Sequence, residues 1–378
     1  MAAGVAMTVT AGAFAVPALA GTPGYGGGHG EGHRATQKAM EAAVNEDAPG
    51  VTAQAKDKHG TWNSAAGIGD LARQSPRGAH DRYRIGSTTK TFVSTVVLQL
   101  VAEGELSLDD TVGRWLPGVV EGHGHDGDRI TVRQLLNHTS GIFNVTADEG
   151  FQDKVFSEKF LAHRFDTWTA EQEVAIAMRH EPDFDPGEGW NYSNTNYLLA
   201  GMIIEKVTGE TYADEIRRRI IKPLGLHATK VPETDSSMPK PSSRAYTKLS
   251  DAPDAKNHDV TELNPSVAGA SGGMISDAAD LNRFYTALLR GKLLPKKQLA
   301  AMKTTVSEGE DSPDERYGLG LASRKTSCGT VVWGHGGDIH GSTSMSLASE
   351  DGRHALAANF NGPAGDWPAV LNAEFCGK

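Results

Sequence analysis

The chain has 378 residues, with 37 Lys or Arg against 47 Asp or Glu and a formal net charge of −10 at pH 7. This length is enough to bury a full hydrophobic core, as one large domain or as two lobes. The negative charge gives no general attraction for phosphate backbones or anionic lipid surfaces, so we expect neither nucleic acid nor membrane as a partner. After the N-terminal segment, no apolar run reaches the roughly 20 residues of a membrane span.

The N-terminal segment has the features of an export signal. Residues 1–20 are small, apolar and uncharged, and they end in Ala18-Leu19-Ala20, which is typical of a signal-peptidase site. We predict a signal peptide over 1–20 and a secreted, extracellular protein; the alternative is a buried N-terminal helix. The usual positive opening segment is missing, so we expect the true start codon to lie upstream of Met1.

Residues 21–34 are Gly-rich and predict a flexible linker, in which we place His29 and His33. A helix should follow from about residue 35, and then two strands at 51–57 and 61–69. The segment after Ser87 repeats apolar residues at helical spacing, and Gly104 is expected to end that helix.

The middle of the chain, about residues 111–259, is rich in helical patterns and in Pro and Gly turns, and it predicts a helical insertion. Its clearest helix begins near residue 194 and should end at Gly209. From about residue 260 we expect a strand and then a helix that ends at Gly291.

The last hundred residues have the short alternating segments of an antiparallel sheet. We predict four strands followed by a C-terminal helix, at 317–323, 329–337, 342–349, 353–360 and 367–375. Together these elements predict an α/β (α+β) domain over residues 35–378, in which the two ends of the chain form a sheet with helices on its faces.

The chain contains two cysteines, Cys328 and Cys376. An exported protein meets an oxidising environment, which favours a disulfide between them. The alternative is a pair of free buried thiols.

Two Ser-x-x-Lys pairs occur, and their surroundings differ. Ser237 and Lys240 lie in a stretch with two prolines that forbid a regular helix. Ser87 opens a strong helix, so Lys90 lies one turn away on the same face. There, the backbone N–H of the serine is available as half of an oxyanion hole, and a buried lysine at the positive end of the helix has a lowered pKa. The alternative is a helix-capping serine with a solvated lysine.

Two further segments contain residues suited to the same chemistry. Tyr192-Ser193-Asn194 precedes an apolar helix, where a tyrosine can relay a proton and an asparagine can hold both sides of an amide. His335-Gly336-Gly337 ends an apolar strand, and its glycines allow a substrate to approach the backbone. The backbone N–H of Asp338 is then the candidate for the second oxyanion donor. The alternatives are an Asn-rich helix cap and a Gly-rich turn.

In this order, the three motifs resemble the serine penicillin-recognising family, which includes class C β-lactamases and DD-peptidases. The nearest resemblance is to secreted Streptomyces D-alanyl-D-alanine carboxypeptidases, and it covers nearly the whole mature chain, including "ITVRQLLNHTSGI", "YGLGL", "WGHGG" and the terminal "FCGK". The resemblance implies a β-lactamase/DD-peptidase-like fold, with an antiparallel sheet flanked by helices, an all-helical lobe and the site in the cleft between them.

The resemblance also implies a role for each matching residue. Ser87 is expected to be the acylated nucleophile, and Lys90 its neighbouring base. Tyr192 is expected to pass a proton to the leaving group, and Asn194 to orient the substrate amide. His335 occupies the place of the lysine in the Lys-Thr-Gly motif of relatives. Gly337 matches the glycine of that motif, and the two cysteines match a disulfide.

Three positions depart from the carboxypeptidase pattern. Gly336 stands where relatives that release D-alanine have threonine, Ala322 stands where they tend to have a basic residue, and Asp338 adds a carboxylate. Like charges would repel a carboxylate tail, although Arg324 or His340 offers a compensating positive charge. We therefore expect intact acylation chemistry with a changed leaving-group preference.

The function expected from these observations is a serine hydrolase of the D-Ala-D-Ala carboxypeptidase type, acting through a Ser87 acyl-enzyme. Its substrate would be a small peptide, β-lactam or ester, with peptidoglycan stem peptides as a natural source. D-Aminopeptidase, esterase, class C-like β-lactamase and a penicillin-binding protein without turnover remain as alternatives. We expect a monomer with no cofactor and no metal, since no His/Asp/Glu cluster has ligand spacing.

Overall fold

The computed structural model describes residues 32–250, 252, 254–309, 313–363 and 365–377. The predicted signal peptide and most of the predicted linker lie outside these described residues. The C-terminal end of the linker prediction is wrong, because His33 is buried and its Nδ1 lies 3.0 Å from Glu374 Oε2. Its ring also stacks on Trp62 at a centroid distance of 5.1 Å. The buried carboxylate of Glu374 is a partner for His33 that the sequence around His33 does not reveal.

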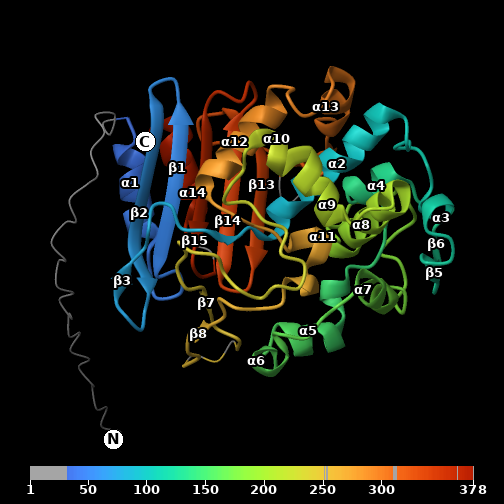
Figure 1. Cartoon of the computed structure of the whole chain (residues 1–378), viewed down its shortest axis with the longest axis horizontal. Helices are drawn as coiled ribbons and strands as arrows, with labels where there is room; N and C mark the ends of the chain where they lie inside the picture. The colour runs from blue at the N-terminus through green and yellow to red at the C-terminus, as the bar shows by residue number, and fades with distance from the viewer. Residues whose placement is uncertain (1–31, 251, 253, 310–312, 364, 378) are drawn as a thin grey trace, which may run out of the picture.

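A nine-stranded antiparallel sheet forms one side of the molecule (Figure 1). The strand order is β10-β11-β12-β13-β14-β15-β1-β2-β3. Strand β1 lies between β15 and β2, and Val51 is opposite Phe360. The prediction that both ends of the chain build one sheet is therefore confirmed. The strands are β1 Gly50–Asp57, β2 Gly60–Asp70, β3 Ser75–Pro76, β10 Val306–Ser307, β11 Glu315–Tyr317, β12 Ala322–Lys325, β13 Val331–Ile339, β14 Ser342–Ser349 and β15 Ala355–Phe360.

Helices cover both faces of this sheet. On one face, α1 (Arg34–Ala43) and α14 (Trp367–Cys376) pack with Leu356 and Ala358 of β15. On the other face, α12 (Ala278–Leu289) packs with the residues between them, such as Ala357. This alternation follows from the two-residue period of a strand and explains why β15 is buried along its whole length.

The helical lobe lies beside the sheet and is built around α2 (Thr89–Glu103) and α8 (Asn194–Thr208) (Figure 1). Both helices end as predicted, at Gly104 with φ 79° and at Gly209 with φ 76°, which are left-handed conformations that favour glycine. The other helices of the described chain are α3 Val112–Trp115, α4 Val132–Leu136, α5 Glu149–Val155, α6 Phe160–His163, α7 Ala170–Ala177, α9 Tyr212–Ile216, α10 Lys222–Leu224, α11 Gly269–Gly272 and α13 Lys296–Met302.

Short elements connect the sheet and the lobe. A π-helical turn, Arg217–Ile221, follows α9, and the turns η1 Gly86–Thr88, η2 Val145–Ala147 and η4 Pro265–Val267 are 3-10 helices. The small two-stranded sheets pair β4 (Tyr83–Arg84) with β9 (Ile275–Ser276), β5 (Glu121–Gly122) with β6 (His125–Asp126), and β7 (Tyr246–Thr247) with β8 (His258–Asp259).

Two predicted strands differ from the structure. The segment 317–323 is divided between β11 and β12, because Gly320 has φ 67° and the N–H of Gly318 donates to the carbonyl of Leu321 at 2.9 Å. Within the strand expected near residues 266–275, residues 269–272 form the short helix α11 instead. The small residues of α11 pack against α8. This packing is close, because a Cβ atom on Gly201 of α8 would lie only 2.7 Å from that of Ala270.

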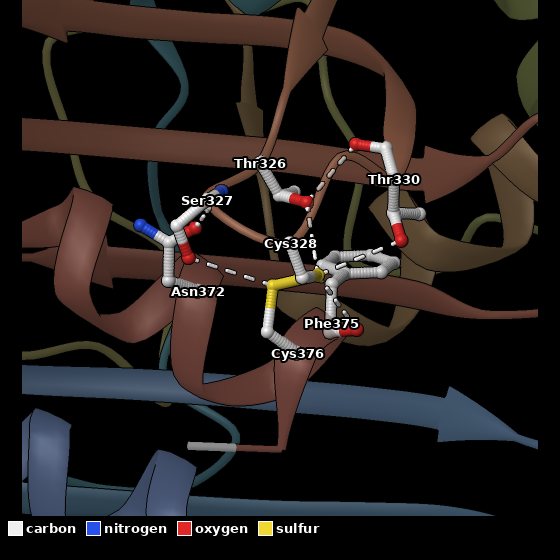
Figure 2. The surroundings of a disulfide bond; sticks show 7 residues. All are labelled: Thr326, Ser327, Cys328, Thr330, Asn372, Phe375 and Cys376. Carbon is white, nitrogen blue, oxygen red and sulfur yellow. Dashed lines mark hydrogen bonds between the residues drawn. A yellow bond between two sulfur atoms is a disulfide. The ribbon is translucent and has the colours of Figure 1, made fainter.

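The predicted disulfide between Cys328 and Cys376 is present (Figure 2). It joins the turn between β12 and β13 to the last residue of α14, across a sequence separation of 48. Beside it, the N–H of Ser327 donates to Asn372 Oδ1 at 2.8 Å, so a hydrogen bond reinforces the covalent link. Among the described helices, none is long and apolar enough to cross a membrane.

Candidate active site

Ser87 lies at the junction of the sheet and the helical lobe. It sits in the turn η1 between β4 and α2, and Thr88, rather than Ser87, is the N-terminal flanking residue of α2. The alternative of a helix-capping Ser87 is therefore wrong, and the Ser87 hydroxyl is free to contact another group. The turn depends on Gly86, which has φ 49° and would carry a Cβ atom 2.7 Å from the backbone nitrogen of Asp338.

Lys90 is fully buried beneath Ser87. Its Nζ lies 3.1 Å from Ser87 Oγ, 2.7 Å from Asn194 Oδ1 and 2.8 Å from the carbonyl oxygen of Ser271. Burial holds the pKa of Lys90 well below its usual range. A neutral amine has two hydrogens and one lone pair, so the amide and carbonyl oxygens can accept both hydrogens. The lone pair then faces the Ser87 hydroxyl.

Tyr192 and Asn194 approach the same pair from the start of α8. The Lys90 Nζ lies 4.7 Å from the centre of the Tyr192 ring. The Tyr192 hydroxyl is buried and has no well-formed hydrogen bond to any described residue. Burial raises the pKa of Tyr192 far above its usual range, and the nearby Ser87 hydroxyl opposes that rise. Tyr192 is therefore a protonated phenol at neutral pH, next to a lysine whose pKa burial holds well below its usual range.

His335 and Gly337 lie on β13, across the cleft from Tyr192. The Tyr317 hydroxyl lies 2.8 Å from His335 Nε2, and burial lowers the pKa of His335 to about 4. The imidazole is thus uncharged, unlike the lysine of the Lys-Thr-Gly motif. A Cβ atom on Gly337 would lie 2.9 Å from the backbone nitrogen of Ser87, so only glycine allows this approach. The approach brings the backbone of Ser87 and Asp338 together, as the oxyanion-hole prediction requires.

A cavity of about 430 Å³ opens above Ser87, between the sheet and the helical lobe. Tyr192, Asn194, His335, Gly337 and Asp338 all line it, whereas Lys90 lies below its floor. The structure therefore brings all the predicted site residues to one place. Within the described ranges, no group of three or more His, Cys, Asp or Glu side chains is placed to hold a metal ion.

The charges around this cavity are mainly negative. Asp338 is exposed in the cleft, where desolvation by surrounding atoms raises its pKa and Thr343 Oγ1 donates to its Oδ1 at 2.7 Å. Glu308 also lines the cavity, and burial, helped by the charge of Glu315, raises its pKa to about 7. Glu315 also lines the cavity, which therefore contains three carboxyl groups.

The two residues proposed to compensate for Asp338 are not available to do so. Arg324 lines the cavity but forms an ion pair with Glu315 and stacks on the ring of Trp367 at 4.3 Å. His340 Nε2 donates to the carbonyl of Val155 at 2.6 Å, and burial lowers the pKa of His340 to about 4. Arg324 is therefore a paired cation, and His340 is uncharged at neutral pH.

Comparisons with known proteins agree with this geometry. The sequence of residues 34–375 matches the family described as beta-lactamase. The chain belongs to the beta-lactamase family. Penicillin-binding protein 4 of Amycolatopsis lactamdurans is 31% identical to it over 207 residues, which are 53% of this chain and 49% of that protein. The chain spans between 32% and 64% of the length of the first curated relatives that it matches.

Two solved structures of this family are similar along nearly the whole chain. One is a D-stereospecific amidohydrolase from a Streptomyces species, at 59% identity and a TM-score of 0.88, covering 92% of this chain and 99% of that one. The other is the D-amino acid amidase of Ochrobactrum anthropi, at 30% identity and a TM-score of 0.78, covering 90% of this chain and 98% of that one. This beta-lactamase-family chain is thus similar along nearly its whole length to two amide hydrolases.

Sequence reasoning missed three residues around the site of this beta-lactamase-family chain. Ser271 provides a carbonyl to Lys90, Tyr317 contacts His335, and His138 lies against Tyr192 with ring centres 4.3 Å apart. The segment "LLNHTSGI" contributes to the resemblance, which is the one available signal for His138. Tyr317 begins "YGLGL", which also contributes to the resemblance, whereas Ser271 lies in a segment that was predicted as a strand.

Proposed function

We propose that this chain is an amidohydrolase that acts through a Ser87 acyl-enzyme on amides whose acyl part is a D-amino acid with a free α-amino group. The single observation that carries this proposal is the charge of the cavity: Arg324 and Glu315 pair with each other, whereas Asp338 forms no ion pair within the described part of the chain. Such a site favours an ammonium group over a carboxylate. The similarity to two D-specific amidases supports the configuration of the substrate.

In the proposed acylation step, Ser87 Oγ attacks the amide carbonyl carbon while the neutral Lys90 amine takes the hydroxyl proton. The lowered pKa of Lys90 suits it to this role, because an ammonium group could not accept the proton. The backbone N–H groups of Ser87 and Asp338 would stabilise the negative oxygen of the tetrahedral intermediate.

Expulsion of the leaving amine then needs a proton at its nitrogen. Tyr192 is proposed to deliver it, since burial keeps this phenol protonated and its ring lies beside Lys90. Water would release the acyl group by the reverse sequence of proton transfers. A base with a lowered pKa and an acid with a raised pKa, side by side, form a suitable pair for this chemistry.

Carboxypeptidase activity, the first expectation from the resemblance, has less support. It needs a positive group for the free carboxylate of the substrate, but Arg324 is held by Glu315 and His340 is uncharged. Esterase and β-lactamase activity use the same acylation step, so they remain side activities of the proposed enzyme. Secretion stays part of the proposal, supported by the disulfide, which is typical of oxidising compartments.

The proposal is tested by steady-state hydrolysis of D-phenylalaninamide beside its L-enantiomer, its N-acetyl derivative and a D-Ala-D-Ala peptide. We expect turnover of D-phenylalaninamide, at least tenfold less for each comparison substrate, and none with Ser87→Ala. Preference for the D-Ala-D-Ala peptide would overturn the proposal in favour of a carboxypeptidase. Stable acylation by benzylpenicillin without turnover of any amide would favour a penicillin-binding receptor.

A further inference from the structure

His138 holds the backbone on both sides of Tyr192. The N–H of Asn191 donates to the carbonyl of His138 at 3.1 Å, and the N–H of Ser193 donates to His138 Nδ1 at 3.2 Å. The imidazole ring also lies against the Tyr192 ring, with centroids 4.3 Å apart. One buried residue therefore holds the residues before and after Tyr192 through its carbonyl and ring nitrogen, and contacts Tyr192 itself through its ring face.

The hydrogen bonds determine which ring nitrogen of His138 carries the proton. Asn196 Nδ2 lies 3.1 Å from His138 Nδ1, and the other amide atom of Asn196, Oδ1, accepts from Ser140 Oγ at 2.7 Å. Nδ1 thus faces two donors, an amide NH₂ and a backbone N–H, and must be an acceptor. The ring is neutral with its proton on Nε2, because burial holds its pKa well below the usual range.

This arrangement of His138 destabilises the folded protein. His138 has φ 62°, a left-handed conformation that is uncommon for residues other than glycine. Its Nε2 is buried and has no hydrogen-bond partner within the described part of the chain. Strained and unsatisfied groups persist mainly where the surroundings hold them for a purpose, and this one adjoins the proposed proton donor.

We propose that His138 is a positioning residue, which fixes the Tyr192 hydroxyl for proton transfer to the leaving amine through the acceptor Nδ1 and the contact of its ring. This inference rests on the proposed function, because it concerns the step in which Tyr192 protonates that amine. His138 itself touches neither substrate nor reacting atoms in this scheme.

The test uses substrates that differ in their need for that proton. A D-aminoacyl amide requires protonation of its leaving nitrogen, whereas the p-nitrophenyl ester of the same D-amino acid releases a stable phenolate without it. In His138→Phe the ring remains and the acceptor is lost. We expect kcat for the amide to fall about 100-fold, with KM for the amide and the burst rate of p-nitrophenol release from the ester, which reports its acylation step, changed less than about threefold.

Two conservative variants separate positioning from simple loss of structure. His138→Asn places an amide oxygen near the position of Nδ1 and tolerates a positive φ, so it should restore most amide turnover. His138→Gln places its amide oxygen near Nε2 instead and should not restore it. The control is His125→Phe, which changes another buried histidine, in β6, outside the cavity lining. We expect this variant to leave the ratio of the amide and ester hydrolysis rates unchanged.

Equal loss of amide and ester hydrolysis, equal behaviour of the Asn and Gln variants, or an unchanged His138→Phe enzyme would each overturn the positioning role. If wild-type protein hydrolyses the ester but no D-aminoacyl amide, the proposed function fails and crystal structures of the variants decide the inference. Tyr192 should then be displaced in His138→Phe and His138→Gln but not in His138→Asn. An undisplaced Tyr192 in all three would overturn it.

Discussion

Lys90 Nζ lies 3.1 Å from Ser87 Oγ, and the lysine is buried while the serine lines the cavity. We predict that Lys90→Met, which keeps the length of the side chain but removes the amine, lowers kcat/KM for amides by about 10³-fold. Acylation, followed by intact-mass analysis with a slow ester substrate, should slow by a similar factor. Lys240→Met changes the lysine of the other Ser-x-x-Lys pair, which is exposed, and serves as the control. Similar activity in both variants would exclude Lys90 as the base.

Asp338 should bind the α-ammonium group of the substrate. Asp338→Asn keeps the shape of the side chain and removes its charge, so we expect kcat/KM for a D-aminoacyl amide to fall about 10- to 100-fold, mainly through KM. The N-acetylated amide should change little, because it has no ammonium group. Glu149→Gln, in the neighbouring cavity that also contains Asp338, is the matched control and should not alter the ratio between the two substrates. A loss shared equally by both substrates would contradict this role of Asp338.

Gly336 and Ala322 should limit carboxypeptidase activity. A Cβ atom on Gly336 would lie 3.6 Å from the carbonyl oxygen of Ser344, which is an ordinary contact, so threonine fits there. We predict that Gly336→Thr together with Ala322→Arg raises turnover of a D-Ala-D-Ala peptide about tenfold, since the pair adds a hydroxyl and a positive charge for the carboxylate. Each single variant shows whether the charge or the hydroxyl is responsible. Unchanged peptide turnover in the double variant would show that these positions do not control leaving-group preference.

The disulfide should stabilise the fold without taking part in the chemistry. On the chain-entropy model, closing a loop of 48 positions contributes about 4 kcal/mol to the free energy of unfolding. We expect Cys328→Ser with Cys376→Ser to lose about that amount in guanidinium titrations, while kcat at 25 °C stays within about twofold. Dithiothreitol should lower the stability of the wild-type protein but not that of the double variant. A large loss of kcat in a still-folded variant would contradict this view.

Buried histidines should make the protein unstable in acid. The pKa values of His335 and His340 are lowered to about 4 by burial, whereas an unfolded histidine titrates near pH 6.5. Between these values the unfolded chain binds more protons, so the free energy of unfolding rises with pH and falls as the pH drops from about 6.5 to 4.

Guanidinium unfolding at a series of pH values between 4 and 8 measures this dependence. Near pH 5, each histidine should contribute about one proton to the slope of stability against pH. His340→Phe keeps a ring against Phe160, on which His340 stacks, and should remove one proton from the slope. His227→Phe changes an exposed histidine and should leave the slope as it is. An unaltered slope in His340→Phe would mean that His340 does not titrate as the fold implies.

Much of the fold was predictable because its signals are local. The helices that end at Gly104 and Gly209, the strands of both chain ends and the C-terminal helix follow from apolar periodicity and from glycine at left-handed positions. The predictions of secondary structure failed where local composition favoured one structure and tertiary packing imposed another. The turn at Gly320 divides a predicted strand, and the small residues of α11 form a helix against α8.

By itself, the sequence determined the family, the order of the elements and the set of residues suited to acyl transfer, because motif spacing and periodicity are properties of neighbouring positions. Only the tertiary structure decided the charges of those residues and of the cavity. Burial lowers the pKa of Lys90, whose partners lie on α8 and α11; His335 is uncharged next to Tyr317; and Arg324 is neutralised by Glu315. Desolvation and ion pairing depend on which distant segments come together, and that information is present only in the folded chain.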